Sequence, residues 1–229
     1  MNEFLKFKNS TETSVDMYVT GDILDDSWKG WSWGEDENTY PSDIRNLLKE
    51  HCGKNLNIYI NSGGGDVFAS VAISNMLSRH DGKTKAVVDG LAASGASVIA
   101  FGCDEIEIPE NAFLMIHKPS VGVRGDANDL REAADTLDTI QDGITKTYLK
   151  KTKEGVEENM ITDLINAETW LTGSEAREYF DVKVVKNQGI LNFAGNYQNN
   201  FKNIPDKVKN TESEMQNIKI TEIEIALNL

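Results

Sequence analysis

Residues 56–80 read LNIYINSGGGDVFASVAISNMLSRH, and this stretch decides the fold class. Leu56–Ile60 is a short run of β-type composition, and the glycines of NSGGG at 61–65 are predicted to end it. A helical pattern follows from about Asp66 to His80, and its apolar residues fall on one face: Val67, Phe68, Val71, Ala72 and Met76. A strand, a glycine-rich turn and a helix together make the unit of parallel α/β sheets.

The same alternation continues on both sides of this stretch. Further strands are predicted at 14–24, 84–88, 105–108, 112–117 and 182–185. Further helices are predicted at about 42–51, 96–102, 126–150, 154–166 and 173–180, the first of them capped by Ser42. The longest helix is predicted to bury one stripe, made of Leu130, Ala133, Ala134, Leu137, Ile140, Ile144 and Tyr148. Because strands alternate with helices, the expected class is α/β with right-handed crossovers.

The composition excludes several kinds of protein. A net charge of −14 argues against binding to duplex nucleic acid or to an anionic membrane surface, because both need Lys and Arg. No run of 18 apolar residues predicts a transmembrane helix, and the first ten residues, MNEFLKFKNS, lack the apolar segment of a signal peptide. Cys52 and Cys103 do not have metal-ligand spacing and there are three histidines, so neither a metal nor a cofactor is expected. Two free thiols predict a reducing cytoplasm.

Two regions differ in character along the chain. Residues 1–186 carry the α/β alternation and are predicted to form one domain. Residues 187–229 are rich in Asn and have no regular apolar period, so a C-terminal tail or linker is expected there. Within it, IKITEIEI at 218–225 is prone to β structure.

His117 is the histidine best placed for chemistry. His51 and His80 each end a predicted helix close to a glycine, where the helix dipole favours a histidine without any function. His117 instead follows the apolar strand AFLMI and precedes Lys-Pro, so it stands at a strand end beside a loop. A structural role for His117 remains equally open at this point.

Two turns between a strand and a helix can present backbone N–H groups. The first is NSGGGD at 61–66, which matches neither phosphate-binding glycine motif but can serve as a tight turn or as an oxyanion cradle. The second is GLAASGAS at 90–97, which is not the GxSxG elbow of α/β-hydrolases. Ser94 in this turn is a candidate nucleophile, Ser97 is its competitor, and close helix packing is the alternative reading of the small residues.

Taken together, these parts are the ones that acyl transfer needs. A serine hydroxyl becomes nucleophilic when a neutral imidazole removes its proton, and N–H groups stabilise the oxyanion that forms. A carboxylate should orient the imidazole. The chain has 37 acidic residues, so spacing alone does not choose one.

Three motifs in register give a specific resemblance. INSGGGDVFASVAI at 60–73, GLAASGAS at 90–97 and MIHKP at 115–119 resemble the ClpP (Clp protease proteolytic subunit) family over about residues 14–186. The resemblance implies that Ser94 is the nucleophile, that His117 is the general base, and that the N–H groups of Gly64 and Gly95 form the oxyanion hole.

The third catalytic residue departs from the pattern of that family. Members usually carry an Asp shortly before a Phe-Leu pair, and the matching stretch here is A167-E168-T169-W170-L171. The resemblance therefore points to Glu168, with Asp163 as the alternative. Gly63 also replaces the proline of the family's NSPGG turn.

The resemblance also implies an architecture and partners. Members have a ClpP/crotonase-like α/β fold of repeated ββα units, with a protruding handle helix, here 126–150, through which rings meet. The rings are homo-oligomers, commonly heptamers, and two of them enclose a chamber. Protein or peptide substrates would add as a strand, with candidate contacts at Gly65, Asp66, Val67, Ser120 and Val121.

Segments 28–48 and 167–176 are similar to the phage and prophage branch of head maturation proteases. Candidate partners are therefore a Clp ATPase or phage capsid and scaffold proteins.

Two rival functions stay open. One is a crotonase-type acyl-CoA enzyme, which needs no serine nucleophile. The other is a catalytically inactive ring subunit, which the Glu at position 168 keeps open.

Overall fold

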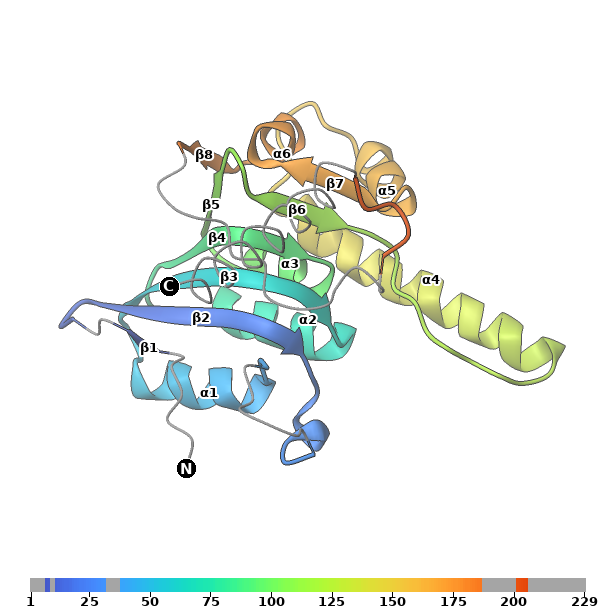
Figure 1. Cartoon of the computed structure of the whole chain (residues 1–229), viewed down its shortest axis with the longest axis horizontal. Coiled ribbons are helices and arrows are strands. Elements are labelled where there is room, and N and C mark those ends of the chain that lie inside the picture. Colours follow the sequence, from blue (N-terminus) through green and yellow to red (C-terminus); the bar gives the residue numbers. More distant parts are fainter. Residues whose placement is uncertain (1–6, 9–10, 32–37, 187–200, 206–229) are drawn as a thin grey trace, which may run out of the picture. The chain divides into compact units, whose positions relative to one another are not determined.

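The computed structural model describes residues 7–8, 11–31, 38–186 and 201–205 (Figure 1). Backbone contacts divide the chain into two units, Met1–Gly195 and Asn196–Leu229, and every described helix and strand belongs to the first. Residues 201–205, the described part of the second unit, contain neither. The rest of the predicted tail at 187–229, including the β-prone stretch 218–225, lies outside the described residues.

In the described part of the chain, eight strands form one sheet in the order β1-β2-β3-β4-β5-β8, with β6 paired to β4 and β7 paired to β6. The strands are β1 (Phe7–Lys8), β2 (Ser14–Ile23), β3 (Asn55–Gly65), β4 (Thr84–Ala93), β5 (Glu105–Pro109), β6 (Phe113–Ile116), β7 (Thr169–Thr172) and β8 (Lys183–Val185). Only the pairs β1–β2 and β6–β7 are antiparallel. The predicted α/β class with parallel crossovers is confirmed.

Six α-helices are described together with this sheet. They are α1 (Pro41–Glu50), α2 (Val67–Ser78), α3 (Gly95–Ala100), α4 (Ala127–Leu149), α5 (Glu158–Asn166) and α6 (Gly173–Tyr179), with a short 3-10 helix at Asp26–Trp28. Figure 1 shows α2 and α3 behind β3 and β4. Along β2, Val15, Met17 and Val19 are fully buried while Asp16 and Tyr18 between them are half-buried, as expected when helices pack against one face only.

The apolar face predicted for α2 is only partly buried, since Val67, Val71 and Met76 pack against the edge of the core. The residues that α2 buries are Ala69, Ser70, Ile73, Ser74 and Leu77, whereas Phe68 is 67% exposed. The reason is the close approach of α3 and the residues that follow it. A Cβ atom on Gly95 would collide with Ser70 Oγ, and one on Gly102 would lie 2.5 Å from Ser74 Oγ. Small side chains must therefore face this contact, and the apolar side chains of Ile73 and Leu77 lie on the same buried face.

Two local predictions also fail, one on the end of β3 and one on the start of α1. The glycines at 61–65 do not end the strand, because β3 continues through Gly65, with φ of 96° at Gly64 and 150° at Gly65. Pairing with Ile23 of β2 holds the extended glycine segment in the sheet. Ser42 does not cap α1: the helix begins at Pro41, whose missing N–H needs no cap, and Tyr40 is the N-cap residue.

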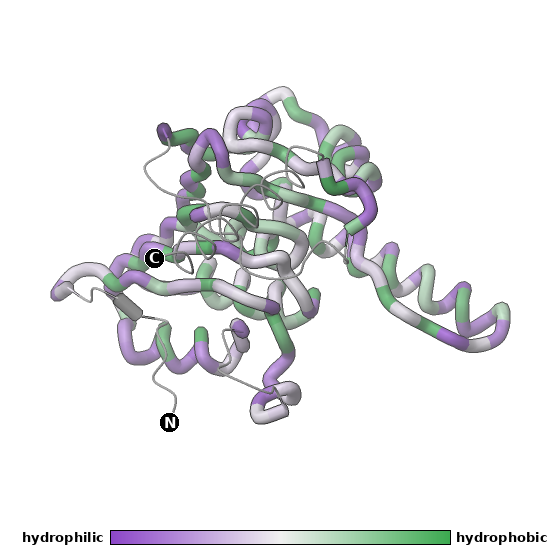
Figure 2. Tube along the Cα trace, viewed as in Figure 1, coloured by the Kyte–Doolittle hydropathy of each residue, from purple (hydrophilic) through white to green (hydrophobic). Residues whose placement is uncertain are grey.

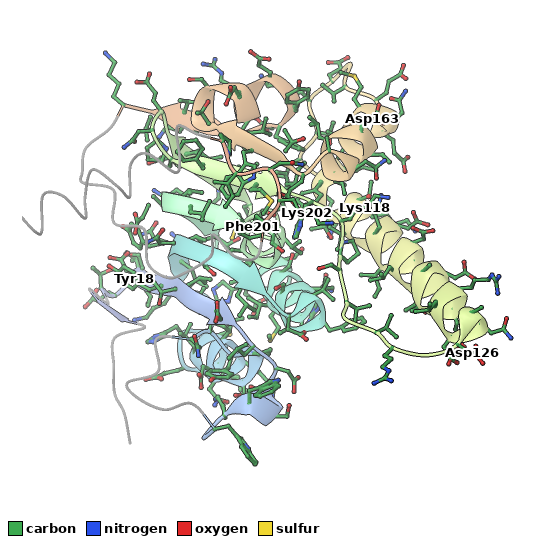
Figure 3. The ribbon with its side chains drawn as sticks, turned by 45° about the vertical axis from the view of Figure 1, so that its right-hand side comes forward. Tyr18, Lys118, Asp126, Asp163, Phe201 and Lys202 are labelled. Carbon is green, nitrogen blue, oxygen red and sulfur yellow. The ribbon has the colours of Figure 1, made fainter. Side chains whose placement is uncertain are left out.

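Helix α4 is buried at one end only. Its buried residues are Ile144, Thr145 and Tyr148, whereas Leu130 is 47% exposed, so the predicted inner stripe is wrong for the first half of the helix. Asp126 closes the exposed end with a capping box, and Figure 3 shows it at the outer tip. Figure 2 shows hydrophilic and hydrophobic residues alternating along the whole of α4. The helix therefore protrudes from the sheet, as the handle of the expected fold does (Figure 1).

Within the described residues, no helix has the length and apolarity to cross a membrane.

Candidate active site

Three adjacent strand ends bring the candidate catalytic residues together. β4 pairs with β6 in parallel, with Ala93 beside Met115. β6 pairs with β7 in antiparallel register, with Ile116 opposite Thr169. Extending the second register by one residue places His117 opposite Glu168, and Ser94 directly follows the last pair of β4. The sheet register alone therefore gathers three residues that lie far apart in the sequence.

Ser94 and His117 are in direct contact. The Ser94 Oγ and His117 Nε2 atoms are 2.7 Å apart, so a neutral imidazole protonated at Nδ1 accepts the hydroxyl proton. Ser94 has φ 53° and ψ −123°, a left-handed conformation that L-residues rarely adopt. It precedes α3 as the N-cap residue but makes no side-chain cap bond, which leaves its hydroxyl free to turn toward the imidazole.

Two opposing effects act on the pKa of the His117 imidazole. Burial lowers the pKa of His117 below its usual value, because the protein interior disfavours the charged form. The negative charge of Glu168 acts in the other direction and raises the pKa of His117 in part. The result is an imidazole that is neutral near pH 7 and has a carboxylate nearby to stabilise its charged form.

Glu168 and the alternative Asp163 occupy different surroundings. Glu168 is half-buried, and its φ of 51° lets the chain turn sharply between α5 and β7. Asp163 is exposed on α5, and Figure 3 shows it well apart from Lys118, the neighbour of His117. Glu168 is the carboxylate whose charge acts on the imidazole, which favours it over Asp163 as the third residue.

Ser97, the competing nucleophile, is enclosed. Its side chain is fully buried, and its Oγ lies 2.5 Å from the carbonyl oxygen of Ser94 and 2.7 Å from the hydroxyl of Tyr148. Because a carbonyl only accepts, the Ser97 proton is held by that carbonyl. Ser97 therefore cannot reach a substrate without rearrangement. The sequence pattern placed Tyr148 in an apolar stripe and did not predict its hydrogen bond to Ser97. The available signal was its hydroxyl, because a buried Tyr usually needs a hydrogen-bond partner.

The glycines pack against the Ser94 turn. A Cβ atom on Gly64 would lie 2.7 Å from the Gly95 nitrogen and 2.8 Å from Ser94 Cβ, so only glycine allows this approach. The Gly64 N–H donates to the buried Ser62 Oγ at 3.0 Å, so it must leave this bond to act in an oxyanion hole.

The candidate substrate contacts lie on two exposed segments. Gly65 and Asp66 are exposed and Val67 is half-buried at the start of α2. The Asp66 side chain caps that helix by accepting from the Ala69 N–H at 2.7 Å. Ser120 and Val121 are exposed in the loop between β6 and α4, where Val121 is 58% exposed.

The remaining histidines and cysteines are not grouped with these residues. His80 Nε2 lies 2.7 Å from the Lys54 carbonyl oxygen and ties the end of α2 to the start of β3. Cys52 is exposed and Cys103 is buried, and both are free thiols. In the parts of the chain that the structure describes, no three His, Cys, Asp or Glu side chains gather closely enough to hold a metal ion.

One comparison with known proteins bears on this site. A family model described as Clp protease matches residues 37–187. The matched range contains Ser94, His117 and Glu168 and the strands that carry them.

Proposed function

The chain belongs to the Clp protease family, and from that premise we propose that it is a serine endopeptidase subunit whose catalytic groups are Ser94, His117 and Glu168. Proteins of this family are serine peptidases that generally form oligomeric rings and act on protein substrates. The single observation that carries the assignment is the contact of 2.7 Å between Ser94 Oγ and His117 Nε2.

The geometry supports the following sequence of steps. His117 takes the Ser94 proton while Oγ attacks the carbonyl carbon of the scissile peptide bond. The carbonyl oxygen becomes an oxyanion, and the protonated imidazole, stabilised by Glu168, then gives its proton to the leaving amine. Water, activated by the same imidazole, attacks the acyl-enzyme and releases the second product and the free Ser94 hydroxyl.

For the oxyanion hole we pair the N–H of Gly95 with that of Gly64. The Gly95 N–H follows the nucleophile directly, and a Cβ atom on Gly64 would lie 2.7 Å from the Gly95 nitrogen, so the two glycines approach closely. The Gly64 N–H donates to Ser62 Oγ and must leave this bond to reach an oxyanion. Such donors act on charge that develops in the transition state, so their effect falls on turnover more than on substrate binding.

Substrate peptides would add as a strand beside Gly65, Asp66 and Val67, with Ser120 and Val121 on the opposite side. The exposure of both segments supports this placement. Main-chain hydrogen bonds carry strand addition, so the cleavage preference should be broad.

Fluorophosphonate labelling followed by peptide mapping tests the proposal. The reagent phosphonylates a serine only when a base has activated it, so the adduct is expected on Ser94. Intact mass should show a single adduct per chain. An adduct on Ser97, or none on a folded protein, would contradict the proposal, and the latter result would favour an inactive assembly subunit. Saturable binding of coenzyme A without labelling would favour the acyl-CoA enzyme.

The proposal extends to homo-oligomeric rings, heptamers by resemblance, that meet through α4. Exposed apolar side chains at Leu130 on α4 and Phe68 on α2 support a partner surface. Analytical ultracentrifugation at micromolar concentration should therefore show a ring-sized particle. A stable monomer under these conditions would count against ring assembly. The proposal includes a role in phage head maturation. Its candidate partners are a Clp ATPase or phage capsid and scaffold proteins. It also includes a separate tail at 187–229.

A further inference from the structure

We infer that Tyr148 and Ser97 are positioning residues that fix the peptide group between Ser94 and Gly95. They form a buried hydrogen-bond chain from the inner end of α4 to the backbone of the nucleophile. This inference rests on the proposed catalytic role of Ser94 and goes beyond it, because neither residue touches the substrate.

The direction of each bond in the chain follows from its chemistry. The Ser94 carbonyl oxygen can only accept, so Ser97 Oγ donates to it over 2.5 Å. With its proton committed there, Ser97 Oγ accepts from the Tyr148 hydroxyl over 2.7 Å. Burial raises the pKa of Tyr148, so its hydroxyl stays protonated and remains a donor.

Tyr148 is itself held firmly. Its side chain is 1% exposed and its ring packs edge-on against Phe101, with ring centroids 4.9 Å apart. Phe180 packs edge-on against the same Phe101 at 4.8 Å. The hydroxyl therefore has a fixed place, which is the property that a positioning group requires.

The chemical consequence comes from the planarity of the peptide bond. The carbonyl of Ser94 and the N–H of Gly95 belong to one trans peptide plane and point in opposite directions. A chain that fixes the direction of the carbonyl therefore also aims the Gly95 N–H, the proposed oxyanion donor. The orientation of this plane relative to the Ser94 Cα is the ψ angle of −123°, so the same chain also fixes the strained backbone beside the hydroxyl.

The hydrogen-bond chain supplements backbone bonds and does not replace them. The Ser94 carbonyl also accepts from the N–H groups of Ser97 at 3.0 Å and Val98 at 3.3 Å. Loss of the side-chain bonds should therefore loosen the peptide plane without unfolding α3. Because complete loss of one oxyanion donor costs about 10²–10³ in kcat, a misaligned donor should cost roughly 10-fold or more.

The test compares Tyr148→Phe, Ser97→Ala and the double variant with wild type. Peptide hydrolysis should show kcat lowered roughly 10-fold or more and KM nearly unchanged, because the donor acts in the transition state. Tyr148 acts through Ser97, so the double variant should lose no more than Ser97→Ala alone. Matched controls are Tyr179→Phe, a half-buried tyrosine on α6, and Ser74→Ala, a buried serine on α2, and both should retain wild-type kcat.

A second measurement separates this inference from the proposed function. Hydrogen exchange at the Ser97 and Val98 amides, which bond the Ser94 carbonyl, should be faster in both single variants, while the denaturation midpoint stays close to that of wild type. This readout needs no activity, so it judges the hydrogen-bond chain even if wild type fails to hydrolyse peptides. Unchanged exchange, unchanged kcat, or additive losses in the double variant would overturn the inference.

Discussion

Ser94→Ala is expected to lower the turnover of a fluorogenic peptide by about 10⁶-fold, the usual cost of losing a triad nucleophile. The substitution removes the oxygen that contacts His117 Nε2 at 2.7 Å, so no acyl-enzyme can form. The fold should survive, because the backbone bond from the Ser94 N–H to the Met115 carbonyl oxygen does not involve the side chain. Initial rates and a denaturation curve on the same preparation measure both effects.

The matched comparison is Ser97→Ala, a second serine of the same turn. Its loss is expected to cost roughly 10-fold or more through misalignment, and at most the 10²–10³ of a missing oxyanion donor. The two serines should therefore differ by several orders of magnitude. If Ser94→Ala kept activity above the Ser97→Ala variant, the nucleophile would be assigned to the wrong residue.

Glu168→Gln should lower kcat by about 10⁴-fold, as found when the orienting carboxylate of a triad becomes an amide. The pH profile gives a second signature. In wild type, burial lowers the pKa of His117, so the acid limb of kcat/KM should have its midpoint below the ordinary value of 6.5. The Glu168 charge raises that pKa, so its removal should shift the residual acid limb to still lower pH.

Asp163→Asn provides the control for this prediction. This substitution also removes one negative charge, near the end of α5. Because Asp163 is exposed, the variant is expected to keep the wild-type rate and pH profile. An acid limb that moves with Asp163→Asn and stays fixed with Glu168→Gln would reverse the choice between the two carboxylates.

Much of the site followed from the sequence because it depends on chain order and strand type. His117 stands where one predicted strand ends and Ser94 lies in the turn that follows another, and parallel strands carry their ends to one edge of the sheet. The α/β class followed for the same reason. The resemblance pointed to Glu168, but its place opposite His117 depends on the register of β6 against β7, which no periodicity in the sequence reveals.

The features that the sequence did not predict depend on distances between elements of the folded chain. The face of α2 was assigned by hydrophobicity, but contact with Gly95 and Gly102 required small residues such as Ser70 there. The hydrogen bond from the Gly64 N–H to Ser62 Oγ was likewise not foreseen. Both outcomes depend on where neighbouring atoms lie after folding, and residue type alone does not carry that information.

The one-sided burial of α4 divides this helix into two parts with different freedom to vary. Substitutions around Leu130 alter a surface that the core does not need, so charge and shape there can change during evolution at little cost in stability. Substitutions around Tyr148 disturb packed aromatic rings and the backbone beside the nucleophile at once. A single helix thus joins a segment that tolerates new associations to a segment that does not tolerate change.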